Sequence, residues 1–161
     1  MENTQGRYAD DNPRPPMVAL DLGEKRIGVA VSDELSITIT RLKVLRRTNW
    51  KQLLQDVDAI VRRFDAKSLV IGLPLQANGS SGDAAAAIRT EAEKFARSLS
   101  IPVYLQNERL SSVEAEENLR ADGHPKKRIQ ELIDAEAAAI ILRDFIVTSE
   151  ARTLVQPGKD S

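Results

Sequence analysis

The sequence contains no cysteine among its 161 residues, and this absence excludes several kinds of chemistry. Disulfide bonds, thiolate metal sites and cysteine nucleophiles all require that side chain. Histidine is nearly absent as well, because His124 is the only one, so one chain cannot form a multi-histidine zinc site. A catalytic or metal site in this protein must be built from other side chains.

Aromatic residues and excess positive charge are also scarce. The chain has one tryptophan, two tyrosines and three phenylalanines, which are too few for a platform that stacks single-stranded bases. Its formal net charge is -1, so it has no overall basic field. If it binds nucleic acid, it must do so through local basic patches or metal ions.

No apolar run approaches the length of a membrane span. The N-terminal stretch MENTQGRYADDNPRPP is polar and rich in proline, without the apolar core of a signal peptide. We therefore expect a cytoplasmic protein with no membrane contact. Its length fits a single domain, which we place at residues 17–148, between a disordered arm (1–16) and a flexible tail (149–161).

Hydrophobic periodicity predicts three strands first, and then strands that alternate with helices. The apolar run MVALDL and the alternating run RIGVAVSD form a hairpin around a short turn, and ITITRLKVL is the third strand. Strands SLVIGLP and PVYLQNE follow, with helices expected from Asn49, Asp83, Ser111 and about residue 129. This order predicts an α/β fold with a five-stranded mixed sheet and helices on both faces. The first three strands are antiparallel, and the fourth and fifth run parallel to the first.

Three carboxylates occupy positions where an acid is unexpected. Asp21 ends the first apolar run beside the small residues of the next strand, where it either forms the turn or binds a ligand. Glu108 ends the fifth strand, either as a charge paired with Arg109 or at a ligand-binding strand end. Asp134 shares a helical stripe with apolar residues, so it needs a cation partner, either a metal ion or an arginine.

Three carboxylates without histidine or cysteine would form a site of oxygen ligands. Such a site suits Mg²⁺ or Mn²⁺ better than Zn²⁺, and two such ions can support phosphodiester hydrolysis. Lys25 and Arg26 follow Asp21 closely and either neutralise it or bind a phosphate. We interpret the other basic clusters as solvated faces, with the third as the best candidate for backbone contact: Arg41/Lys43/Arg46/Arg47/Lys51, Arg62/Arg63/Lys67 and Lys126/Lys127/Arg128.

Four segments in order resemble the YqgF family, whose members are described as Holliday junction resolvases or pre-16S ribosomal RNA nucleases. The segments are ALDLGEKRIGVAVSD, LVIGLPLQANGSSG, NERLSS and IDAEAAAIIL, and the resemblance spans about residues 17–147. It implies a ribonuclease H-like fold and a metal-dependent nuclease site with ligands at Asp21, Glu108 and Asp134. In our hypothesis for such a site, Lys25, Arg26, Arg109 and Ser111 position the substrate phosphates.

Three features depart from the family pattern. Asn107 replaces the usual aspartate, which weakens the site if that aspartate is a ligand. Ser111 and Ser112 replace threonines and keep the hydroxyl groups. Glu136 stands where the family has a small or apolar residue, which bears on how the last helix is rotated against the sheet.

The leading hypothesis is an endonuclease that uses Mg²⁺ or Mn²⁺ and processes the 5′ end of pre-16S ribosomal RNA, in contact with ribosomal precursor particles. Resolution of Holliday junctions in branched DNA is the alternative, and we expect a monomer or a weak homodimer. A non-catalytic RNA-binding assembly factor is a further class. An ATP-binding module of the actin and sugar-kinase type also has an Asp-x-Gly turn after its first strand, but it needs two such domains.

Overall fold

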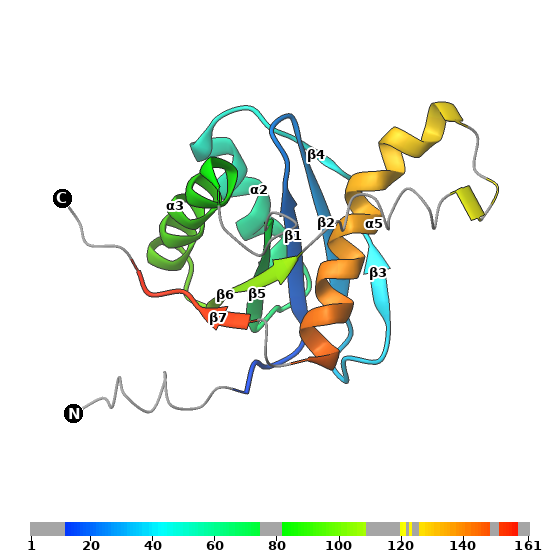
Figure 1. The fold of residues 1–161 in the computed structure, drawn as a ribbon. Helices are drawn as coiled ribbons and strands as arrows, with labels where there is room; N and C mark the ends of the chain where they lie inside the picture. Colours follow the sequence, from blue (N-terminus) through cyan, green and yellow to red (C-terminus); the bar gives the residue numbers. More distant parts are fainter. Residues whose placement is uncertain are drawn as a thin grey trace, which may run out of the picture.

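The computed structural model describes residues 12–74, 82–108, 120–121, 123, 126–148 and 152–157. Its strands are β1 (Met17–Leu22), β2 (Arg26–Ser32), β3 (Ile39–Arg41), β4 (Leu45–Arg46), β5 (Ser68–Pro74), β6 (Val103–Glu108) and β7 (Arg152–Leu154). Its helices are α2 (Trp50–Arg63), α3 (Asp83–Ser98) and α5 (Lys126–Val147). The strands form one mixed sheet in the order β3-β2-β1-β5-β6-β7, and β4 pairs with β2 (Figure 1).

The strand directions confirm the predicted α/β fold with its mixed sheet. Strand β1 is antiparallel to β2 and parallel to β5, and β5 is parallel to β6. The described part of the chain has seven strands, however, and not the five predicted. The expected third strand is divided into β3 and β4, which both pair with β2. The other addition, β7, pairs antiparallel with β6 and covers an edge that would otherwise expose unpaired backbone groups.

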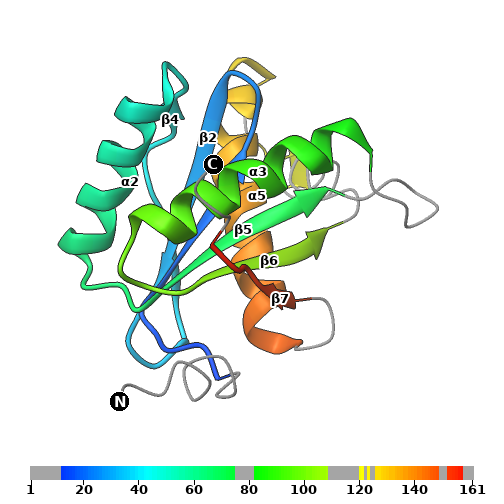
Figure 2. The same ribbon diagram turned by 90° about the vertical axis from the view of Figure 1, so that its left-hand side faces the viewer.

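Helices cover the two faces of the sheet, as Figure 2 shows, with α2 and α3 on one side and α5 on the other. Alternate strand residues point to opposite faces, so β1 contributes to two separate cores. Val18, Leu20 and Leu22 belong to the core under α2 and α3, whereas Met17 and Ala19 belong to the core under α5. The same alternation places the side chain of Asp21 on the α5 side.

The helix starts follow the capping residues only in part. The side chain of Asn49 accepts a hydrogen bond of 2.9 Å from the backbone N of Gln52, which confirms the predicted start of α2. Gly82, and not Asp83, precedes α3, and no side chain caps this helix. The last helix begins at Lys126, slightly before the predicted position. The helix expected from Ser111 lies outside the described residues except at its end.

The segment just before β1 makes backbone contacts with the start of β5. The Ser68 hydroxyl donates to the Arg14 carbonyl at 2.9 Å and accepts from the Arg14 amide at 3.2 Å. The backbone N of Lys67 donates to the carbonyl of Pro16 at 2.8 Å. Arg14 and Pro16 are therefore hydrogen-bonded to residues at the start of β5. None of the described helices combines the length and apolarity needed to cross a membrane.

Candidate active site

Asp21 lies near the C-terminal end of β1, at the centre of the sheet. Its cross-strand partner on β2 is Gly28, which has no side chain to fill the neighbouring space. Burial, and then the nearby negative charge of Asp134, raises the pKa of Asp21 from 3.8 to about 6. The fold therefore holds two carboxylates close together in a partly desolvated position, which costs free energy when no cation is bound.

Asp134 reaches this position because α5 packs directly on the backbone of β2. A Cβ atom added to Gly28 would lie 1.8 Å from the carbonyl oxygen of Asp134. The small residues beside Asp21 were expected to leave room for a ligand or for close helix packing, and Gly28 does the latter. On the helix, Ala138, Ile141 and Phe145 are buried against the sheet, as their spacing from Asp134 predicted.

The cation partner of Asp134 in the structure is an arginine. Arg26 donates from Nε to Oδ2 of Asp134 at 2.8 Å, and the two side chains are 41% and 15% exposed. Arg26 was expected either to neutralise Asp21 or to bind phosphate, and its ion pair is instead with Asp134. Beside this pair lies a cleft of about 290 Å³, which is lined by Gly23, Glu24, Lys25, Arg26 and Asp134.

Glu108 lies at the end of β6, on the same face of the sheet but two strands from β1. Its side chain is only 8% exposed, and its partner on β5 is Pro74. Neighbouring strands are about 4.8 Å apart, so about 10 Å separates the β1 and β6 backbones. Among the described residues, no three acidic, histidine or cysteine side chains are close enough to hold one ion. The structure thus brings Asp21 and Asp134 together and leaves Glu108 apart.

The donors fit a hard divalent cation. Carboxylate oxygens are the ligands that Mg²⁺ and Mn²⁺ prefer, and a cation would offset the burial and the repulsion from Asp134 that raise the pKa of Asp21. Arg109 and Ser111, the other predicted substrate contacts, lie outside the described residues.

Two arginines that we interpreted as part of a solvated cluster are used inside the fold. Arg47 donates from Nε to the Gly23 carbonyl at 2.9 Å, and its two Nη atoms bond to Glu91 on α3 at 2.7 and 3.1 Å. It therefore ties the β1–β2 turn, which carries Lys25, to the opposite helix layer. A partial signal for this was present in the sequence, because alternation along the chain directs Arg47 inward when Leu45 is inward.

The second of these arginines, Arg41, explains the departure at Glu136. Arg41 on β3 forms a two-bond ion pair with Glu136, one bond from Nε and one of 2.9 Å from Nη2. The Glu136 carboxylate therefore lies at the edge of the sheet, paired and almost fully buried. The predicted inward rotation of the last helix holds, with Asp134 facing the site and Glu136 facing β3.

The comparisons with known proteins point to one family. A family model described as "RuvX: Holliday junction resolvase" matches residues 16–148. The chain belongs to the RuvX (YqgF) family. A RuvX relative from Anaeromyxobacter sp. (strain Fw109-5), named "Putative pre-16S rRNA nuclease", is 40% identical over 129 residues, covering 80% of this chain and 94% of the relative. A relative of the same name from Synechococcus sp. (strain JA-3-3Ab) is also 40% identical, and the match covers 80% of this chain and 81% of the relative.

The fold of this RuvX protein is similar to that of a known resolvase. The structure of T. thermophilus RuvC in complex with a Holliday junction substrate superimposes with a TM-score of 0.52. The match covers 86% of this chain and 98% of the other, at 16% sequence identity. This likeness confirms the ribonuclease H-like fold that the sequence motifs implied.

The raised pKa of Asp21 predicts how stability depends on pH without metal. The folded state binds a proton at Asp21 more tightly than the unfolded state, because the pKa is about 6 and not 3.8. The free energy of unfolding should therefore fall by about 3 kcal/mol as the pH rises from about 4 to 6, and stay low above that range. Urea unfolding in a chelator, with Asp21→Asn as the reference, isolates this contribution. If the free energies of unfolding of the two proteins changed with pH in parallel, Asp21 would not be the source of the pH dependence.

Proposed function

We propose that this protein is a metal-dependent endonuclease that hydrolyses phosphodiester bonds in structured nucleic acid. The observation that carries the proposal is the pairing of Asp21 and Asp134 at the end of the central strand, beside a cleft lined by Lys25 and Arg26. The ion pair of Arg26 is made with Asp134, so a metal ion would further stabilise the partly buried Asp21 beside it, and basic residues suit a phosphate group. Membership of a family of nucleases and resolvases supports the same chemistry.

Asp21 and Asp134 would hold Mg²⁺ or Mn²⁺, with Glu108 contributing from β6. When bound, these ions supply Lewis acidity, which favours ionisation of a water molecule and stabilises the leaving oxygen. The role of the chain is to fix the carboxylates on rigid elements, with α5 held over β2 by the contact at Gly28. Lys25 and Arg26 would bind phosphate oxygens at the cleft, and Arg109 and Ser111 would add further contacts.

For the substrate, we propose pre-16S ribosomal RNA, processed at its 5′ end in the cytoplasm, in ribosomal precursor particles. Curated relatives at 40% identity carry the name "Putative pre-16S rRNA nuclease", which supports this choice. Holliday junction DNA is the second candidate, because the family model is described as a resolvase. A resolvase that cuts a four-way junction symmetrically needs two active sites, whereas an RNA-processing enzyme can act as a monomer.

The test compares both substrates in one assay. The wild-type protein should cleave a pre-16S ribosomal RNA fragment in Mg²⁺ or Mn²⁺ but not in chelator, and Glu108→Gln should lower the rate about a hundredfold or more. Light scattering on the same samples gives the oligomeric state. Preferential cleavage of a four-way junction by a dimer would favour the resolvase. Tight RNA binding without cleavage across Mg²⁺ and Mn²⁺ titrations would replace the nuclease by a binding factor.

A further inference from the structure

Two arginines face each other across neighbouring strands next to the cleft. Arg26 on β2 pairs directly with Arg46 on β4. Residues directly opposite in an antiparallel pair point to the same face, and like charges in that position destabilise the sheet. The adjacent pair, Ile27 and Leu45, packs into the core under α2 and α3, so the two arginines face the α5 side.

The basic residues around this pair have different partners. Arg41 is paired with Glu136 and Arg47 with Glu91, and Arg26 uses Nε for Asp134. Arg46 is exposed, and among the described residues no carboxylate forms an ion pair with it. Arg46 therefore carries a charge that the described fold does not neutralise, directly beside another cation.

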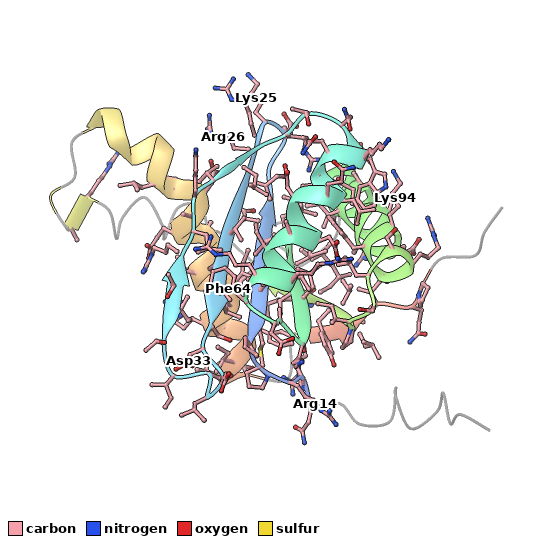
Figure 3. The ribbon with its side chains drawn as sticks, turned by 180° about the vertical axis from the view of Figure 1, so that it is seen from behind. Arg14, Lys25, Arg26, Asp33, Phe64 and Lys94 are labelled. Carbon is pink, nitrogen blue, oxygen red and sulfur yellow. The ribbon has the colours of Figure 1, made fainter. Side chains whose placement is uncertain are left out.

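The Arg26–Arg46 pair lies next to the proposed metal site at Asp21 and Asp134. Arg26 lines the cleft together with Lys25 and Asp134. Figure 3 shows Lys25 and Arg26 projecting from the end of the β1–β2 hairpin toward solvent. The first turns of α5, with the sequence Lys126-Lys127-Arg128, extend past the sheet on the side of β4 (Figure 1). A polyanion that enters the cleft would therefore meet Arg46 as it leaves over β4.

We propose that Arg26 and Arg46 together bind one phosphate of the nucleic acid backbone, beside the bond that is cut. The inference rests on the proposed nuclease function and names part of its substrate path. A phosphate between two guanidinium groups replaces their repulsion by charge-assisted hydrogen bonds. Arg46 is then a substrate-positioning residue that extends the cleft onto β4, and it reads the backbone, not the base sequence.

The experiment compares Arg46→Gln with Arg89→Gln. Arg89 is an exposed arginine on α3, on the other face of the sheet, so both variants lose the same charge. Binding of a labelled pre-16S ribosomal RNA fragment is measured by anisotropy in Ca²⁺ over a range of salt concentrations. We expect Arg46→Gln to weaken binding about tenfold and to reduce the slope of log K against log salt concentration by about 1. Arg89→Gln should leave both the affinity and the slope unchanged. Equal effects of the two substitutions would overturn the inference.

A second measurement does not depend on nucleic acid. Titration with inorganic pyrophosphate, followed through the NMR signals of arginine Nε–Hε groups, should shift the signal of Arg46, and Arg46→Gln should weaken pyrophosphate binding. Arg89 should not respond. If Arg46 responds in this way while the protein cleaves and binds no nucleic acid, the nuclease proposal fails and the anion site stands. Absence of any response at Arg46 overturns the anion site itself.

Discussion

Replacing Asp21 by asparagine should lower Mg²⁺-dependent cleavage about a thousandfold and at the same time make the protein more stable at neutral pH. The loss of activity follows because stabilisation by a metal ion is worth several kcal/mol, and each 1.4 kcal/mol is a factor of ten in rate. The gain in stability follows because burial, and then the charge of Asp134, make the ionised Asp21 unfavourable, as its pKa of about 6 indicates. We expect the free energy of unfolding at pH 7 in chelator to rise by about 1–3 kcal/mol.

These opposite signs make the Asp21→Asn result informative. A variant that loses activity because it is misfolded would lose stability as well. Added Mg²⁺ should raise the melting temperature of the wild-type protein, and this shift should be absent or much smaller in Asp21→Asn. Glu24→Gln is the matched control, because Glu24 lines the same cleft but is exposed and lies outside the proposed ligand set. Undiminished cleavage by Asp21→Asn, or equal losses in the two variants, would refute the assigned role.

Periodicity in the sequence predicted the parts of the fold that depend on local pattern. The apolar run MVALDL and the alternation along RIGVAVSD were sufficient to identify the hairpin, and the spacing of Asp134, Ala138 and Ile141 identified the inner face of the last helix. Patterns of this kind placed Asp21 and Glu108 at strand ends and Asp134 on the apolar stripe of the last helix, and the inferred topology placed them together. They lie on one face because strand parity and helix rotation are local properties.

The ion pairs of the basic residues were not predictable in the same way. Arg47 and Glu91 are 44 positions apart, and Arg26 and Asp134 are 108 apart. Charge clusters in a sequence usually form a solvated face. Here, however, the adjacent Arg46 and Arg47 point to opposite faces of the sheet, Arg46 to the α5 side and Arg47 to Glu91 on α3. β7 was missed for a related reason, since three residues carry almost no periodic signal and pair only because β6 offers a free edge.

The distance between α5 and the sheet also could not be predicted from the periodicity of the sequence. Sequence pattern places Gly28 on the same face as Asp21, but it does not show that the helix backbone touches the glycine. A Cβ atom there would lie 1.8 Å from the Asp134 carbonyl oxygen and 2.4 Å from its carbonyl carbon. Both are main-chain atoms, so no side-chain rotation relieves the overlap. The separation of the two proposed ligands therefore depends on the absence of one methyl group.

Gly28→Ala should accordingly be among the most damaging single substitutions in the protein. To accept the methyl group, α5 must move away from β2, which separates Asp134 from Asp21 and opens the core around Ala138. Overpacking of this kind costs typically 1–3 kcal/mol, and we expect about 3 kcal/mol or more because backbone atoms are in the way. Urea unfolding measures the stability change, and calorimetry with Mn²⁺ tests whether metal binding is weakened beyond it.

Gly72→Ala is the matched control for Gly28→Ala, since it adds the same methyl group on the same face of the sheet and under the same helix. Its Cβ would lie 2.3 Å from Cδ1 of Ile141, the far end of a side chain that can change rotamer. This variant should lose about 1–2 kcal/mol and retain metal binding, because the helix backbone over Asp21 need not shift. If the two variants are equally destabilised and bind Mn²⁺ equally well, close contact at Gly28 does not set the position of Asp134, and the carboxylate pair must be held by the Arg26 ion pair instead.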